Sequence, residues 1–201
     1  MKFIKSYLNE TIELVQKIDQ SQIEGVINNI KIIKNQKGRI FFVGVGGGAG
    51  HASHAVNDFR KICGIEAYSP SENISELTAR INDDGWETAY GNWLKGSRIN
   101  NKDMIFVFSV GGGNIEKNIS MNIVFSIKYA KQVGAKIVGI VGKDGGFTAK
   151  VADACVILPT INELNITPHT EGFQAVIWHM IVSHPELREN EMKWESVNQI
   201  K

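Results

Sequence analysis

The sequence has little cysteine: Cys63 and Cys155 are the only two in 201 residues. They lack the spacing of metal-binding cysteine pairs, and two cysteines in a chain of this size do not indicate a disulfide framework. Reduced thiols are typical of proteins of the cytoplasm. We therefore expect a cytoplasmic location and no stabilising disulfide.

Net charge and long apolar runs are also nearly absent. The formal charge is +1, from 22 basic and 21 acidic residues, and no run of Lys or Arg forms a basic stripe. We therefore expect no nucleic-acid partner and no membrane partner. No apolar run approaches the roughly 18 residues of a membrane span, and the charged first 20 residues lack the apolar core of a signal peptide. The expected partner is a small molecule or another copy of the chain.

The sequence does contain enough apolar material, 43% of the residues, for one sizeable core. We expect a single domain over residues 1–201. Apolar side chains at helical spacing predict one or two amphipathic helices over residues 2–35. We assign residues 1–36 to these N-terminal helices, a candidate oligomer surface, and residues 37–190 to an α/β core.

Four short β-rich segments come after these helices, each with glycine or a turn near its end. They are residues 39–45, 104–110, 136–142 and 151–159. Strands that alternate with helical segments predict a parallel sheet covered on both faces, which is a doubly wound α/β fold. In such folds ligands bind at the carboxyl ends of the strands.

Two of these strands run into nearly identical glycine loops. IFFVGVGGG at 40–48 and IFVFSVGGG at 105–113 agree at six of nine positions. Two such loops at neighbouring strand ends would offer backbone N–H groups to one anion, with Gly46, Gly47 and Gly48 on one side and Gly111 and Gly112 on the other. Two other interpretations remain. The glycines can simply serve tight turns, and Gly44 to Ala49 also fits a dinucleotide fingerprint, with Glu66 as the ribose-binding acid.

Two polar pairs have spacings that matter on a helix. His54 and Asp58 are four residues apart, so on a helix they share a face, together with His51, and can grip one metal ion or one substrate. Glu171 and His179 lie in an apolar helix that Pro185 should end. Eight residues span about 12 Å of helix. Glu171 and His179 can therefore bind one ion only if the ion lies between their extended side chains, if Glu171 lies just outside the helix, or if a second subunit contributes.

Structural roles are the alternative for each of these groups. His54 can be a satisfied structural histidine, Glu171 a first-turn acid and His179 a core residue. The segments 82–85 (NDDG) and 142–146 (GKDGG) are typical of turns.

Together these segments resemble the SIS (sugar isomerase) domain family, and within it the phosphoheptose isomerases. Those enzymes interconvert sedoheptulose 7-phosphate and D-glycero-D-manno-heptose 7-phosphate. The matching features are the paired N-terminal helices, the GVGGG loop, the His54 to Asp58 pair, the Asn82-Asp83 dipeptide, the SVGGGN loop, the GKDGG turn, and the Glu171 to His179 spacing.

The resemblance implies a flavodoxin-like three-layer sandwich and a homotetramer with active sites near subunit interfaces. It implies a site that holds one Zn²⁺, and an activity in heptose supply for surface polysaccharide such as lipopolysaccharide or capsule. The implied zinc ligands are His54, Asp58, Glu171 and His179. Asp58 and His179 would be the acid and the base, in either order, and the phosphorylated sugar would meet Asp83, Ser109 and Asn114 as well as the loop glycines.

The residues depart from the family pattern in two ways. The family has Glu where this chain has Asp58, and Gln where it has Glu171. The family also grips phosphate with Ser and Thr hydroxyls, whereas Gly48, Val110, Gly111 and Asn114 stand in those positions here and Ser109 is the main hydroxyl left. We therefore keep two rivals to a phosphoheptose isomerase. One is a non-catalytic phosphosugar sensor or replication-initiator-binding adaptor, and the other is an isomerase of a different sugar.

Overall fold

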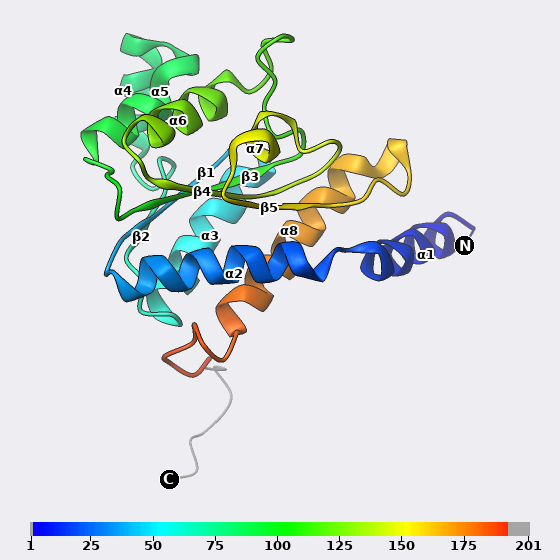
Figure 1. Cartoon of the computed structure of the whole chain (residues 1–201). Helices are drawn as coiled ribbons and strands as arrows, with labels where there is room; N and C mark the ends of the chain where they lie inside the picture. The colour runs from blue at the N-terminus through cyan, green and yellow to red at the C-terminus, as the bar shows by residue number, and fades with distance from the viewer. Residues whose placement is uncertain (1, 193–201) are drawn as a thin grey trace.

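A computed structural model describes residues 2–192 of the chain (Figure 1). Its centre is one fully parallel five-stranded sheet in the order β2-β1-β3-β4-β5. The strands are β1 (Ile40–Gly44), β2 (Ala67–Tyr68), β3 (Met104–Ser109), β4 (Lys136–Val141) and β5 (Ala154–Ile157). This is the flavodoxin-like strand order, and it confirms the doubly wound fold. The expected strand at 151–159 is shorter than predicted, because Val151 still belongs to a helix.

Helices cover both faces of the sheet, so the molecule has three layers (Figure 1). They are α1 (Lys2–Lys17), α2 (Gln20–Asn35), α3 (Gly47–Lys61), α4 (Ile74–Asp84), α5 (Trp86–Gly96), α6 (Met121–Gln132), α7 (Gly146–Val151) and α8 (Ile166–Ser183), with a short 3₁₀ turn at Glu163–Asn165. The α2, α3 and α8 helices pack on one face, against Phe42, Phe106 and Phe108. The α5 and α6 helices pack on the other, against Phe41 and Val107. Alternate strand residues therefore feed two separate apolar layers.

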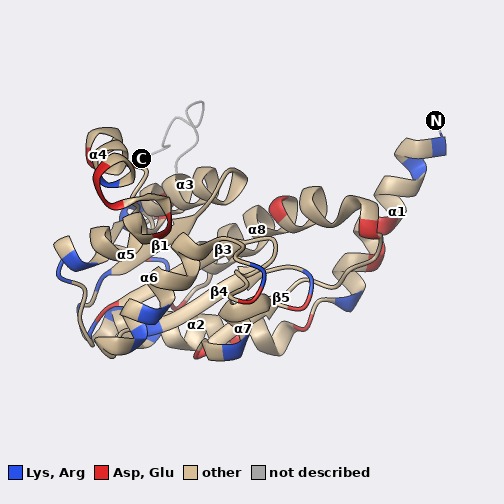
Figure 2. Ribbon diagram, turned by 90° about the horizontal axis from the view of Figure 1, so that it is seen from above, with Lys and Arg blue, Asp and Glu red and all other residues tan. Residues whose placement is uncertain are grey.

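The predicted N-terminal helices are two, α1 and α2. The break between them comes at Asp19, whose carboxylate accepts the Ser21 N–H at 2.9 Å and so caps the start of α2. The α2 helix lies against the sheet, whereas α1 extends past one end of it (Figures 1 and 2). Of the residues in α1, Leu14 is fully buried.

The base of α1 is fastened to the start of α8 by one carboxylate. Glu10 accepts hydrogen bonds from the side chains of Asn162, Asn165 and His169 at 2.8–2.9 Å. These bonds, with that from Asn165 the largest contribution, lower the pKa of Glu10 to about 2. The ring of Tyr7 also stacks on His169, with centroids 4.5 Å apart.

One predicted turn is wrong and another is confirmed. Asn82, Asp83 and Asp84 are the last residues of α4, because Leu77 and Ile81 give this segment an apolar side that packs on the core beneath it. The chain turns only at Gly85, which has a φ of +83° and separates α4 from α5. The segment 142–146 is a turn as predicted, closed by a Gly145 N–H to Gly142 carbonyl bond of 3.0 Å.

Within residues 2–192, no helix has both the length and the apolar character needed to cross a bilayer. The last nine positions of the predicted domain, 193–201, lie outside the described residues.

Candidate active site

The two glycine loops meet at the carboxyl ends of β1 and β3, which are neighbours in the sheet. Gly44 pairs with Phe108 in the parallel register. Just beyond, Gly48 packs so closely on β3 that an added Cβ would lie 2.5 Å from the Phe108 carbonyl oxygen. A side chain at position 48 therefore has no room, and the glycine here serves a close approach of two backbones.

The two loops continue into different structures. The first runs directly into α3, with Gly46 as N-cap at a φ of +58°. The second continues through a small antiparallel bridge between Asn114 and Ile119 before α6 begins. It is also bound to the turn after β4, because the Gly142 and Phe147 N–H groups donate to the carbonyls of Val110 and Gly113 at 3.0 and 2.8 Å.

A cavity of about 310 Å³ lies between the loops and the first half of α8. It is lined by Val45, Gly48, Phe108, Ser109, Val110, Gly111, Ile119, Ser120, Lys143, Thr167, Glu171 and Gln174. Gly48, Ser109 and Gly111 therefore lie at the edge of a common cavity, as the sequence predicts.

The other predicted substrate contacts do not line this cavity. Gly46 and Gly47 form the entry to α3, and Gly112 is buried against the turn after β4, where Thr148 donates two hydrogen bonds to its carbonyl. The carboxamide oxygen of Asn114 accepts the Lys117 N–H within its own turn. Asp83 is exposed on α4, where it accepts a hydrogen bond from Asn82.

A cluster of three candidate ligands lies along the seam between α3 and α8. His54, Asp58 and His179 each offer a ligand atom, and these atoms lie within 4.8 Å of one another. The Asp58 Oδ2 atom is 3.8 Å from His54 Nε2 and 3.9 Å from His179 Nε2. The helical spacing of four residues brings His54 and Asp58 together as expected, and the packing of α8 on α3 adds His179.

Hydrogen bonding sets the orientation of the last histidine. His179 Nδ1 lies 2.7 Å from the Ala175 carbonyl, which can only accept, so Nδ1 carries the proton in this contact. Nε2 is then the nitrogen with the free lone pair, and it is the one that faces Asp58. Two imidazoles and a carboxylate with this arrangement fit a Zn²⁺ ion.

Glu171 stands apart from the three-residue cluster. It lies within α8, so the interpretation that places it just outside the helix is wrong. Its carboxylate occupies the space beside Gly47, where an added Cβ would come within 2.5 Å of it, and it lines the cavity between the loops. A carboxylate is favoured there by the dipole of α3. Its predicted role as a fourth ligand stays a prediction.

His51 lies one helical turn before His54, beside the same cavity. Its ring makes an edge contact with Phe108, with centroids 6.1 Å apart. Burial lowers the pKa of His51, and the charge of Glu171 only partly opposes this, so the ring is neutral near pH 7. The sequence places His51 on the ligand face, but its spacing alone gives it no specific role.

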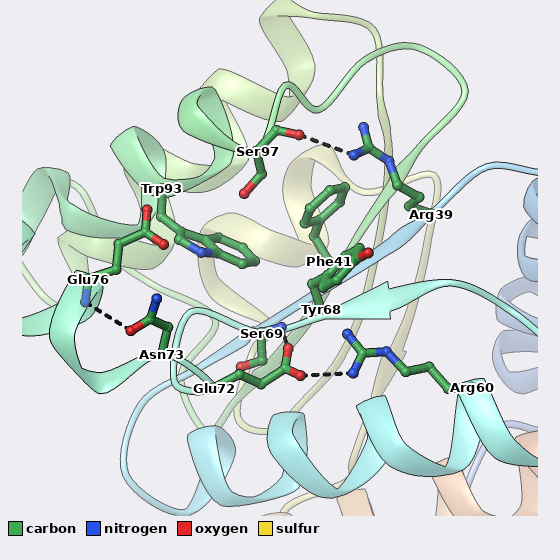
Figure 3. Close-up of a pocket in the computed structure, with 10 residues that line it drawn as sticks. All are labelled: Arg39, Phe41, Arg60, Tyr68, Ser69, Glu72, Asn73, Glu76, Trp93 and Ser97. Carbon is green, nitrogen blue, oxygen red and sulfur yellow. Dashed lines mark hydrogen bonds and ion pairs between the residues drawn. The ribbon is translucent and has the colours of Figure 1, made fainter.

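A second, more open cleft of about 370 Å³ lies over β2, between α3 and the α4–α5 pair (Figure 3). Its charged groups already have partners: Arg60 pairs with Glu72 at 3.0 Å, Arg39 with Asp103 at 2.7 Å, and Glu76 with Arg80 at 2.7 Å. Phe41 and Trp93 form its apolar floor, in an edge-to-face contact. Because these charges are already paired, we do not assign the active site to this cleft.

No protein-family model matches the sequence. Among curated proteins, the chain is 31% identical over 159 residues to a phosphoheptose isomerase of Nitratiruptor sp., covering 77% of this chain and 79% of that one. It is 29% identical over 210 residues to a phosphoheptose isomerase of Sulfurimonas denitrificans, covering 98% and 99% of the two chains. It is also 29% identical to the lincomycin biosynthesis protein LmbN of Streptomyces lincolnensis, over 70% of this chain and 54% of that protein.

Solved structures show the same fold. The phosphoheptose isomerase of Neisseria gonorrhoeae superposes with a TM-score of 0.78 at 18% identity, covering 90% of this chain and 97% of that one. The phosphoheptose isomerase of Francisella tularensis gives a TM-score of 0.74 at 16% identity, covering 91% and 96%.

Proposed function

This chain belongs to the phosphoheptose isomerase family of SIS-domain proteins, and from that membership we propose that it isomerises sedoheptulose 7-phosphate to D-glycero-D-manno-heptose 7-phosphate. It is a sugar-phosphate isomerase, an enzyme that moves a carbonyl between C2 and C1. Its product supplies heptose for surface polysaccharide.

The observation that carries the proposal is the cluster of His54, Asp58 and His179 between α3 and α8, the same two helices that contribute Gly48 and Glu171 to the cavity bounded by the glycine loops. Aldose–ketose isomerisation moves one proton from C1 to C2 through an enediol and a second proton between the two oxygens. Asp58 and His179 come from different helices and face each other at 3.9 Å, so they can act as a base and an acid on adjacent atoms. Only the free Nε2 of His179 is placed for this role, because Nδ1 is occupied by Ala175.

The donor set also suits a zinc ion, which His54, Asp58 and His179 would hold with Glu171 as the proposed fourth ligand. Because Nε2 is the free nitrogen of His179, it would either bind the ion or transfer a proton, and not both at once. When bound, the ion stabilises negative charge that develops on the substrate oxygens. The protein's part is to keep His179 in one tautomer and to keep Asp58 largely shielded from water, with 13% of its side chain exposed.

We further propose a cytoplasmic homotetramer whose active sites lie near subunit interfaces. Support comes from apolar side chains that the single chain leaves exposed. On α1 these are Phe3, Ile4, Leu8, Ile12 and Val15, and on α8 they are Val176 and Met180. Val176 lies three residues before His179 and so shares its side of α8, and a partner chain seated on this face would also shield the candidate site.

The test is turnover of sedoheptulose 7-phosphate by the purified protein, followed by NMR of the sugar carbonyl carbons. Conversion that is lost in the His179→Ala variant supports the proposal. Binding of the sugar phosphate without any conversion would instead identify a phosphosugar-binding protein.

A second candidate is isomerisation of a different phosphorylated sugar. The observation in its favour is the contact of Gly48 with the Phe108 carbonyl, which leaves no room for the serine that the family has in this loop. A panel of ketose phosphates of five to seven carbons, assayed under the same conditions, separates the two candidates by their kcat/KM values.

A further inference from the structure

The two glycine loops carry fewer hydroxyl side chains than the family pattern, with Ser109 as the main one left, so a charged partner for the substrate phosphate has particular importance here. We propose that Lys143, in the turn after β4, binds the substrate phosphate with its ammonium group. This inference rests on the proposed function, because it names the phosphate subsite of the same cavity.

Lys143 is the one cation among the described residues that line the cavity between the loops. Its ammonium group has no ion-pair or hydrogen-bond partner within residues 2–192, whereas the carboxylate of the neighbouring Asp144 accepts the Gly146 N–H at 3.2 Å. An unpaired ammonium at the wall of a polar cavity favours an anionic ligand.

The position of Lys143 relative to the second loop is fixed by backbone hydrogen bonds. The Gly142 N–H donates to the Val110 carbonyl at 3.0 Å, and the Thr148 N–H and hydroxyl both donate to the Gly112 carbonyl, at 2.9 and 2.8 Å. The turn and the second loop are therefore held together, which fixes the backbone of Lys143 at the wall of the cavity.

The backbone of Lys143 is unusual for a lysine. Its φ is +53°, in the left-handed region that favours glycine, and it is the first central residue of the turn closed by Gly142 and Gly145. Lys37 adopts the same conformation outside the cavity, so the backbone of Lys143 does not by itself indicate a ligand, and the inference rests on the unpaired ammonium at the cavity wall.

The other wall of the cavity is suited to the sugar. Gln174 is fully buried and donates its Nε2 to the Ile140 carbonyl at 2.9 Å, while its Oε1 atom has no hydrogen-bond partner among the described residues. That oxygen is enclosed by the protein, so the group on this wall that can accept a sugar hydroxyl is the carboxylate of Glu171, whose charge also repels phosphate. The substrate is therefore oriented with its phosphate toward Lys143 and its hydroxyls toward α8.

The experiment compares three variants of the full-length protein. Lys143→Asn removes the charge with a residue that tolerates a positive φ, and Lys143→Arg keeps the charge. Lys37→Asn is the matched control, because Lys37 is also an exposed lysine in the left-handed region, with a φ of +55°, but lies outside the cavity. Dissociation constants are measured by calorimetry for inorganic phosphate and for sedoheptulose 7-phosphate, and turnover is measured separately.

We expect Lys143→Asn to raise the dissociation constants of both ligands by about tenfold or more. Lys143→Arg should keep most of the wild-type affinity, and Lys37→Asn should bind both ligands as the wild type does. Wild-type affinity in Lys143→Asn overturns the inference, even if the enzyme turns over the sugar. Absence of phosphate binding by the wild-type protein also overturns it. If phosphate binding depends on Lys143 but the protein does not turn over the sugar, the phosphate subsite is supported and only the proposed isomerase activity is contradicted.

Discussion

The Oδ2 atom of Asp58 lies 3.9 Å from Nε2 of His179, although the two residues are 121 positions apart in the sequence and belong to different helices. The contact depends on the packing of α8 against α3. It joins a carboxylate that is mostly shielded from water to an imidazole that is about half exposed, with 13% and 47% of the side chains accessible. The imidazole is therefore the member of the pair that can be removed with little loss of packing.

Replacing His179 with alanine should abolish most of the isomerase activity and leave the fold intact. The side chain contributes a proton-transfer group, worth about 10²–10⁴ in rate, but little buried surface. The measurements are kcat for sedoheptulose 7-phosphate and the midpoint of thermal unfolding. His184→Ala is the control, because His184 ends the same helix outside the ligand cluster. A His179→Ala enzyme with normal kcat would remove the acid/base assignment.

Metal content should depend on the residues of the cluster. We expect elemental mass spectrometry of the purified protein to find about one zinc per chain. The His54→Ala variant should lose most of it, and chelation should inactivate the wild type. Asp83→Asn serves as the comparison, since Asp83 is exposed on α4 and is absent from the cluster. Equal zinc in the His54→Ala and wild-type proteins would place the metal elsewhere.

Adjacent glycines in the second loop should respond differently to serine. Gly111 has open space around its Cα, so Gly111→Ser should fold normally, and its added hydroxyl should strengthen phosphate binding. Gly112 has a φ of +65°, and an added Cβ would collide with the Gly145 carbonyl. Gly112→Ser should therefore lose about 1–3 kcal/mol of unfolding free energy. Chemical denaturation measures the unfolding free energy of both variants. Equal stability of the two variants would show that the loop moves freely away from the turn after β4.

Acid should release α1 from the start of α8. The pKa of Glu10 is lowered from 4.5 to about 2 in the folded chain, so the ionised carboxylate stabilises the docked helix above pH 4.5. This contribution falls as the pH drops from 4.5 to 2, because the carboxylate becomes protonated. Hydrogen exchange of the α1 amides at several pH values, corrected for the intrinsic pH dependence of amide exchange, should show falling protection across that range. Glu10→Gln should exchange faster already at pH 7, and a wild-type rate in that variant would contradict the role of the carboxylate.

Much of the fold can be predicted from the sequence because the central strands are continuous apolar runs, and β1, β3 and β4 lie where these runs predict. The β2 strand has no such signal, since two residues, Ala67 and Tyr68, are too few to give a pattern. The composition of segment 82–85 predicts a turn, and this prediction is wrong because residues 82–84 are helical. Tertiary packing of Leu77 and Ile81 keeps the segment helical up to Asp84.

The site is predictable only where its residues share one element. The spacing of His54 and Asp58 sets their common face, but the addition of His179 requires the packing of two helices. Lys143 lies in a segment that the sequence identifies only as a turn. The hydrogen bonds that fix this turn on the second glycine loop join residues 32 to 36 positions apart, which no local pattern reveals.

The close approach of Gly48 to the Phe108 carbonyl also limits how this protein can evolve. A single mutation to serine at position 48 would not recreate the hydroxyl-lined loop, because the backbone of β3 occupies the space that the new Cβ requires. The ends of β1 and β3 would first have to separate through other substitutions. Changes in substrate preference are therefore more accessible to this lineage at Gly111 and Lys143 than at the first loop.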